Sequence, residues 1–194
     1  MPGVAPAAAW KKARFHQPWH EGDTILVSIG QGFNLTTPLQ MARVVAAVAN
    51  GGIVYKPYLV EKVESPAGEI LYQAKPEVQS RLGASRANLE VVRQSLVGVV
   101  NDGTAKAARL SNIQVAGKTG TAQVVALDRD NPKKKREHQM EDHAWFVAYA
   151  PADDPQVAVA VLVEHGGHGG EEAAPLASRV IKAGLSEPKV AQVE

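Results

Sequence analysis

The sequence predicts an α+β fold in which helices cover both faces of an antiparallel sheet. One reason is the segment 157–163, which is apolar at every position, as in a strand that is covered on both faces. Another is that apolar residues elsewhere recur at helical spacing between helix start and stop signals. The predicted strands of the sheet occupy 115–125, 143–150 and 156–164, and the main helices occupy 37–50, 85–100 and 172–185.

Composition bounds the class of protein before any motif is considered. The chain has 194 residues, of which 45% are hydrophobic, and this is enough to build a core. Its formal net charge of +1 gives no general attraction to nucleic acid or membrane surfaces. It contains no cysteine, which excludes a disulfide framework and a thiol nucleophile. No apolar run approaches the roughly 18 residues of a membrane-spanning helix, and residues 1–20 lack the apolar core of a signal peptide.

The N-terminal part of the chain contains one helix with clear boundaries. Residues 1–23 are rich in Ala, Pro and basic side chains, so we expect a loop there with one short helical turn at most. After a short apolar run, Thr37 is a candidate N-cap, Pro38 suits the first helical position, and Gln40 completes a capping box. Apolar residues then recur on one face until Asn50, where two glycines end the helix.

The middle of the chain predicts a hairpin followed by a second helix. Residues 58–73 form the hairpin, because two β-prone runs flank a turn that contains Pro66 and Gly68. The helix over 85–100 has apolar residues at helical spacing, and a short helical turn is expected near 105–109, just before the central strand.

Strand 115–125 carries a cation, two hydroxyls and a bare backbone at its centre, in the run Lys118-Thr119-Gly120-Thr121. Side chains alternate across a strand, so Thr119 and Thr121 should share one face while Lys118 points to the other. Glycine inside a strand marks a bulge or a place where another group approaches the backbone. Two hydroxyls beside an ammonium group and a bare backbone would suit a substrate carboxylate. On Lys-Thr-Gly alone, the alternative is an ordinary strand with a solvent-facing lysine.

Short motifs stand on either side of this strand in a definite order. They are Gly30-Gln31-Gly32, Thr37-Pro38-Leu39-Gln40 and Asn50-Gly51-Gly52 before it, and His143-Ala144-Trp145-Phe146-Val147-Ala148-Tyr149-Ala150-Pro151 and Glu164-His165-Gly166-Gly167-His168-Gly169 after it. In this order they resemble the C-terminal part of the transpeptidase domain of class B penicillin-binding proteins, within that class the transpeptidases of cell elongation. Lys-Thr-Gly is the third motif of that superfamily.

The resemblance implies a partial penicillin-binding protein or serine β-lactamase-like fold. Residues 1–185 would be a C-terminal fragment of one transpeptidase domain, and 186–194 would be a disordered tail. In the family, Gly30-Gln31-Gly32 would form a tight connection into the helix that follows, which is a structural role.

The resemblance also implies a function, that of a peptidoglycan D,D-transpeptidase that β-lactams inhibit. In such enzymes a serine is acylated by the D-Ala-D-Ala end of a stem peptide. Lys118 would supply positive potential and help to move protons, and the Thr121 N–H would be one of two oxyanion donors. Thr119, Gly120 and Thr121 would bind the terminal carboxylate of the substrate. No cofactor is implied.

The nucleophile of such an enzyme is missing from this sequence. The family's Ser-x-x-Lys and Ser-x-Asn precede Lys-Thr-Gly. Here the only Ser-x-x-Lys begins at Ser186, after it, and Pro188 would obstruct the required helical turn; no Ser-x-Asn occurs. We therefore expect a fragment that begins at Met1 and is inactive alone. The alternatives are a non-catalytic binding module and a fragment of a protein related to serine β-lactamases.

Two polar segments admit other functions. The loop 128–139 contains four consecutive basic residues, which predict either a solvated loop or a basic anchor for anionic glycan or lipid. No aromatic residue is interleaved with these charges, which argues against nucleic acid. Glu164, His165 and His168 could suggest a metal site, but their spacing is loose and no cysteine accompanies them, so no metal is predicted.

The resemblance further implies a location and partners for a full-length parent. Class B enzymes sit at the periplasmic face of the bacterial inner membrane, on an N-terminal membrane helix, and work with membrane proteins of the elongation machinery. In their fold, two strands that precede the nucleophile pair beside the strand equivalent to 156–164. One edge of that strand should then be open here. An uncharged, β-branched edge without proline invites self-association through 157–163.

Overall fold

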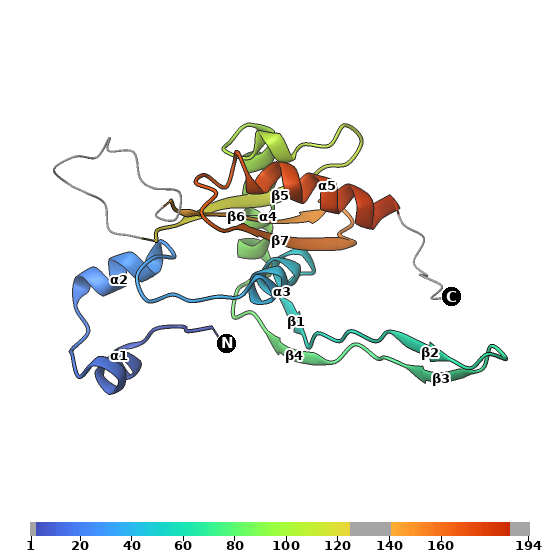
Figure 1. Ribbon diagram of the computed structural model, residues 1–194, viewed down its shortest axis with the longest axis horizontal. Helices are drawn as coiled ribbons and strands as arrows, with labels where there is room; N and C mark the ends of the chain where they lie inside the picture. Colours follow the sequence, from blue (N-terminus) through green and yellow to red (C-terminus); the bar gives the residue numbers. More distant parts are fainter. Residues whose placement is uncertain (1–2, 125–140, 187–194) are drawn as a thin grey trace.

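The computed structural model describes residues 3–124 and 141–186, and an antiparallel sheet lies at its centre (Figure 1). Three strands form this sheet in the order β5-β6-β7: β5 (Ala116–Ala122), β6 (His143–Ala150) and β7 (Val157–Val163). Among the described residues, β5 and β7 are therefore the edges. The predicted strands are confirmed, although β5 is shorter than 115–125. Residue 125 and the predicted basic loop 128–139 lie outside the described residues.

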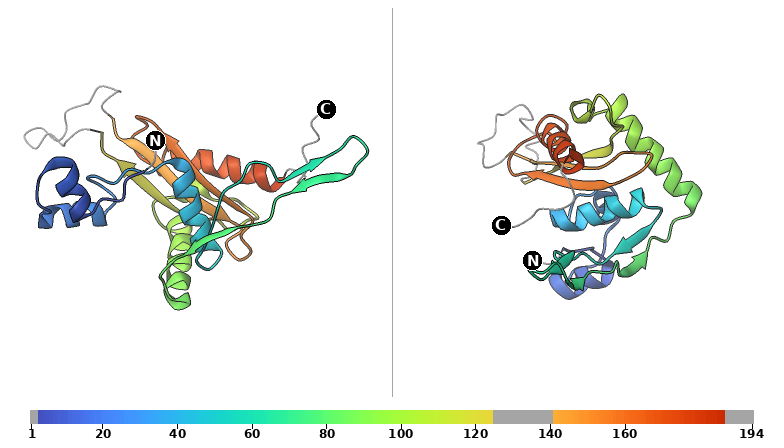
Figure 2. Two further views of the ribbon diagram at one scale, coloured as in Figure 1. Left: turned by 90° about the horizontal axis from the view of Figure 1, so that it is seen from below. Right: turned by 90° about the vertical axis from the view of Figure 1, so that its right-hand side faces the viewer.

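Helices cover both faces of the sheet, as the α+β prediction requires (Figure 2). On one face, α5 (Ala173–Ser186) packs on β6 and β7, and Phe146 and Ile181 are fully buried there. On the other face, α3 (Pro38–Ala49) packs on the same strands, and its Val45 joins Tyr149 in a second core. Alternate residues of β6 thus enter opposite cores, which explains why the strand is apolar almost throughout.

The helix α3 begins as the sequence predicts. The Thr37 hydroxyl oxygen accepts a hydrogen bond from the Gln40 N–H at 3.2 Å, and the Gln40 side-chain oxygen accepts one from the Thr37 N–H at 2.9 Å. This reciprocal pair satisfies two backbone donors that the first turn of a helix leaves free. The helix ends at the Asn50 C-cap, also as predicted.

The helix α4 (Arg86–Asn101) contributes to both cores. Its Leu96 packs on the α3 side of the sheet, while Val100, one turn further on, is buried on the α5 side. The 3₁₀ turn η1 (Lys106–Ala108) then connects α4 to β5, and Ala108 is fully buried. The predicted helices over 85–100 and near 105–109 are both confirmed.

The N-terminal region is more helical than the sequence suggested. The helices α1 (Ala8–Phe15) and α2 (Glu21–Ser28) replace the expected loop and apolar run. Ala, Lys and Arg in α1 are strong helix formers, and Pro6 and Pro18 lie outside the helix, where they interrupt nothing. The expectation of one helical turn at most was therefore wrong.

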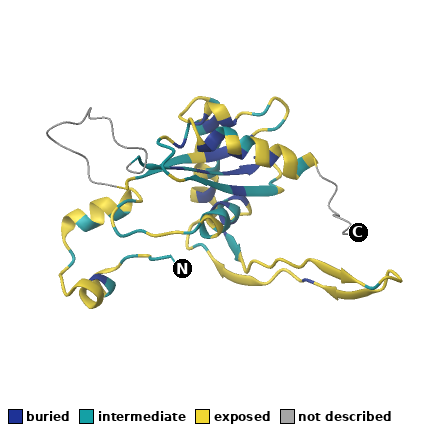
Figure 3. Ribbon diagram, in the orientation of Figure 1, coloured by how far each residue is buried: buried dark blue, intermediate teal, exposed yellow. Residues whose placement is uncertain are grey.

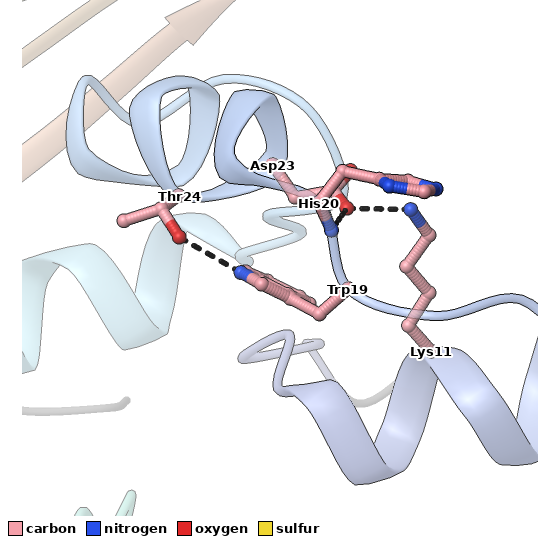
Figure 4. Close-up of polar contacts among 5 residues, drawn as sticks. All are labelled: Lys11, Trp19, His20, Asp23 and Thr24. Atoms are coloured by element: carbon pink, nitrogen blue, oxygen red, sulfur yellow. Dashed lines mark hydrogen bonds and ion pairs between the residues drawn. The ribbon is translucent and has the colours of Figure 1, made fainter.

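A nearly buried ion pair joins the two N-terminal helices (Figure 4). Lys11 Nζ donates to Asp23 Oδ2 at 2.5 Å, and Lys11 is only 4% exposed. The same carboxylate accepts the His20 N–H at 2.7 Å, which caps the start of α2. The Lys11 hydrogen bond, helped by that of His20, holds the pKa of Asp23 below its usual range.

The part of the chain that connects α3 to α4 forms a β arm, which projects away from the central sheet (Figure 1). At its base, β1 (Ile53–Tyr55) pairs with β4 (Val78–Arg81), and further out β2 (Lys62–Glu64) pairs with β3 (Ile70–Gln73). The outer pair confirms the predicted hairpin, whereas the inner pair was not predicted. Figure 3 shows that most of the arm is exposed. No helix in the described part of the chain is long and apolar enough to cross a membrane.

Candidate active site

The register of β5 against β6 decides which way the predicted site residues point. Thr119 lies opposite Phe146 and Thr121 lies opposite Ala144, and both partners belong to the core on the α5 side. Lys118 lies opposite Val147, which packs on the α3 side. The threonines therefore share one face of the sheet and Lys118 points to the other, so the predicted alternation is confirmed.

Glycines in β5 allow large neighbours to approach its backbone. A Cβ atom on Gly117 would lie 2.5 Å from Cζ of Phe146, so the ring of Phe146 packs directly over this glycine. A Cβ atom on Gly120 would lie 3.1 Å from Cβ of Trp145. The group closest to the bare side of Gly120 in this structure is the side chain of Trp145, its partner on β6.

The outer edge of β5 presents polar backbone groups. The Thr119 carbonyl accepts a hydrogen bond from Lys118 Nζ at 3.0 Å, and the Thr121 carbonyl accepts one from Gln31 Nε2 at 2.8 Å. Both carbonyls therefore have a side-chain partner outside β6. In an antiparallel ladder the N–H and C=O of one residue point to the same side, so the Thr121 N–H also points to the open edge. This direction is the one that an oxyanion donor needs.

The Thr119 hydroxyl is held by two other side chains. Its Oγ1 lies 2.9 Å from Oγ1 of Thr104 and accepts a hydrogen bond from Lys118 Nζ at 3.3 Å. Lys118 is exposed, while Thr119, Gly120 and Thr121 are half-buried. The structure thus gathers an ammonium group, two hydroxyls and an accessible backbone edge within one short strand.

The segment after β7 packs against the same end of β5. Gly169 is buried, and a Cβ atom there would collide with the carbonyl oxygens of Trp145 and Gly120. Nearby, the His165 N–H donates to Nδ1 of His143 at 2.9 Å. The lack of a side chain at Gly169 is therefore needed for its close contact with the site strand.

Sequence reasoning missed two residues that contact the site. Gln31 was given a structural role in a tight connection, but its side chain reaches β5. Thr104 carries no motif that would mark it in the sequence, although its hydroxyl contacts that of Thr119. Gly30 and Gly32 flank Gln31 with positive φ angles of 76° and 69°. Glycines on both sides of Gln31 were the sequence feature that could have indicated an unusual backbone directing its side chain toward another part of the fold.

The sequence raised two other candidates, a metal site at Glu164, His165 and His168 and a nucleophile at Ser186. In the described residues no group of three or more His, Asp or Glu is placed to hold a metal ion, so His165 and His168 form no such cluster with Glu164. Ser186 ends α5, where its hydroxyl donates to the Lys182 carbonyl at 2.7 Å. A helix of that length spans about 20 Å, which separates Ser186 from the end of α5 that lies beside Gly169. Lys189 lies outside the described residues.

The chain matches the family model of the penicillin-binding protein transpeptidase domain over residues 9–182. It is 39% identical over 200 residues to the peptidoglycan D,D-transpeptidase MrdA of Haemophilus influenzae. The aligned region covers 97% of this chain and 30% of that relative. The chain therefore spans less than one third of the length of this curated relative.

Solved structures show the same likeness. The complex between penicillin-binding protein PBP2 and MreC from Helicobacter pylori has a TM-score of 0.72 at 30% identity, over 95% of this chain and 31% of that one. The ceftriaxone acyl-enzyme complex of penicillin-binding protein A from M. tuberculosis has a TM-score of 0.70 at 35% identity, over 83% of this chain and 35% of that one. The chain belongs to the penicillin-binding protein transpeptidase family, with peptidoglycan D,D-transpeptidases of the MrdA and PBP2 type among its relatives.

Proposed function

We propose that this chain provides the substrate-binding strand of a peptidoglycan D,D-transpeptidase. The observation that carries this proposal is the open edge of β5, where Lys118, Thr119 and Thr121 come together in a chain of this family. The substrate would be the D-Ala-D-Ala end of a peptidoglycan stem peptide, and β-lactams would compete for the same edge.

Each residue has a role that follows from its chemistry. The hydroxyls of Thr119 and Thr121 donate hydrogen bonds to the terminal carboxylate, and Gly120 leaves the edge between them unobstructed. The Thr121 N–H is one of the two donors for the oxyanion that forms when a serine attacks the scissile carbonyl. Lys118, whose ammonium group lies beside Thr119, raises the local positive potential and helps to move protons.

The isolated chain should not complete this reaction, because its sequence has no Ser-x-x-Lys before Lys-Thr-Gly and no Ser-x-Asn. The nucleophilic serine would also provide the second oxyanion donor. Loss of one such donor typically raises the barrier by about 2.7–4 kcal/mol, so half an oxyanion hole is a severe defect. Activity therefore requires a longer protein in which those motifs precede this chain.

A fluorescent penicillin tests the proposal directly. The isolated chain should remain unlabelled in a denaturing gel, whereas a longer protein that carries both serine motifs should be labelled at its serine. Stoichiometric labelling of the isolated chain would overturn the assignment and implicate Ser186. Absence of labelling in the longer protein would instead support a non-catalytic binding module.

Replacement of Lys118 by Ala provides the matched test of the site. In the longer protein we expect the acylation rate to fall by about 10²–10³, as for other lost electrostatic partners of a transition state. Folding should change little, because Lys118 is exposed. Lys182→Ala, at an exposed lysine on α5, is the control. A Lys118→Ala rate within about twofold of the parent's would show that Lys118 has no catalytic role.

The family relation also suggests where such a protein works. A full-length parent would act at the periplasmic face of the bacterial inner membrane, where peptidoglycan precursors are cross-linked. The PBP2 relative from Helicobacter pylori forms a complex with MreC, which supports a partner of that kind for the parent of this chain. Residues 1–185 would then be one C-terminal part of its transpeptidase domain.

A further inference from the structure

Thr104 is held firmly beside the site although it lies outside β5. It follows α4, and the residues on either side of it are tied back to that helix: the Gly103 N–H donates to the Gly98 carbonyl and the Ala105 N–H to the Val99 carbonyl, both at 3.1 Å. From the other side, Gly170 packs so closely that a Cβ atom there would collide with the Thr104 carbonyl oxygen. The backbone of Thr104 is thus confined by two separate parts of the chain.

The Thr104 hydroxyl meets that of Thr119 at 2.9 Å, and either oxygen could donate in this pair. A hydroxyl has one O–H donor and two acceptor lone pairs. Lys118 Nζ can only donate, so Thr119 Oγ1 already accepts at one of its lone pairs. The direction of the Thr104–Thr119 bond therefore decides whether the Thr119 hydrogen remains free.

A carboxylate can only accept hydrogen bonds. If Thr119 donated to Thr104, its single hydrogen would be used and it would have none for a ligand. If Thr104 donates, both lone pairs of Thr119 are filled by Lys118 and Thr104, and its hydrogen points outward to the ligand. Only the second arrangement is compatible with carboxylate binding.

We propose that Thr104 is a positioning residue that donates to Thr119 and thereby directs the Thr119 hydroxyl toward the substrate carboxylate. This inference rests on the proposed function for its ligand, but its geometric part does not. Thr104 acts through Thr119 and touches no reacting atom itself. The sequence feature involved is the threonine fourteen residues before Lys118, at the end of the Asn101-Asp102-Gly103 turn.

The geometric part is tested in the isolated chain without any ligand. Three-bond NMR couplings to Cγ2 of Thr119 report whether its side chain keeps one χ1 rotamer. We expect one rotamer in the parent chain and in Thr104→Ser, and averaging among rotamers in Thr104→Val. The same change at the exposed Thr36, Thr36→Val, is the matched control and should leave Thr119 unaffected. A single, unchanged Thr119 rotamer in Thr104→Val would overturn the proposal.

The binding part is tested by titration with N-acetyl-D-alanyl-D-alanine, followed at the amide signals of β5. Thr104→Val should weaken binding by about three- to tenfold, the range for one lost hydrogen bond, and Thr104→Ser should restore it. In a Thr119→Val background, Thr104→Val should cause no further loss of binding affinity, because a residue that acts only through the Thr119 hydroxyl has no effect once that hydroxyl is removed.

The outcomes separate this inference from the proposed function. If the parent chain shows no peptide binding, the carboxylate-binding role of β5 fails, and the rotamer measurement alone decides whether Thr104 orients Thr119. If the parent chain binds and Thr104→Val binds equally well, the proposed function stands and the role of Thr104 is refuted. Equal losses from Thr104→Val with and without Thr119 would also refute it.

Discussion

The side-chain amide of Gln31 donates a 2.8 Å hydrogen bond to the carbonyl oxygen of Thr121, a residue 90 positions further along the chain. This bond ties the loop between α2 and α3 to the outer edge of β5. An edge strand has no neighbour to satisfy its outward carbonyls, so a side chain from elsewhere in the fold takes that place. The bond also fixes the peptide group next to the proposed oxyanion donor.

Replacement of Gln31 by Ala should lower the free energy of unfolding by about 1 kcal/mol, the usual net value of one hydrogen bond. Amides at the end of β5 should also exchange faster with solvent. Chemical denaturation and hydrogen exchange measure these effects. Gln94→Ala is the control, because Gln94 makes an exposed bond to Glu90 on α4 that should matter little. Equal stability of the two variants would contradict a role for Gln31 in holding β5.

Replacement of Gly169 by Ala should destabilise the fold by about 1–3 kcal/mol, the typical effect of an added methyl group in a packed interior. The new Cβ atom would collide with the backbone of Trp145 and Gly120, which has no easy direction in which to move. Gly98→Ala on α4 is the matched control, because a Cβ atom there meets nothing within 4 Å. It should stabilise the helix by roughly 0.5–1 kcal/mol. Thermal unfolding that shifted in the same direction for both variants would refute this packing.

Asp23 should make stability depend on pH in the acid range. Its pKa is lowered in the folded state by Lys11 and the His20 N–H, so the unfolded chain binds the proton more tightly. The contribution is therefore present above the unfolded pKa of about 3.9 and is lost as pH falls through the lower folded pKa. Asp23→Asn should be less stable than the parent at pH 7, and the difference should shrink below about pH 4. Urea titrations at several pH values measure this, with Asp154→Asn, an exposed loop residue, as the control.

The open edge of β7 should cause the chain to associate. In the described residues no strand pairs with the outer edge of Val157–Val163. An antiparallel pair of two copies centred on Ala160 would place Val157 opposite Val163 and bury an apolar, uncharged edge. Light scattering should show a mass that rises with concentration between about 1 and 100 μM, with added protection of β7 amides. A monodisperse monomer at the top of that range, with β7 amides as protected from hydrogen exchange as those of β6, would show that this edge does not cause self-association.

Local sequence signals were sufficient for most of the regular elements. The Thr37–Gln40 capping box set the start of α3, and the uninterrupted apolar run at 157–163 indicated a strand covered on both faces. These signals work because capping and periodicity depend on residues within one or two turns of one another. The helix α1 was not predicted because the prolines on either side of it favour a loop, whereas the Ala, Lys and Arg residues within Ala8–Phe15 favour a helix. The pairing of β1 with β4 was missed because both strands are short and distant in sequence.

The sequence by itself determined the site strand, its alternation of Lys118 against Thr119 and Thr121, and the family to which the motifs point. Only the tertiary structure decided that Gln31 and Thr104 reach that strand, and that Gly169 packs on it. The physical reason is that a periodic pattern records which face of an element is buried. A hydrogen bond between distant segments depends on the register of the sheet and on how loops close, and neither leaves a repeating mark in the sequence.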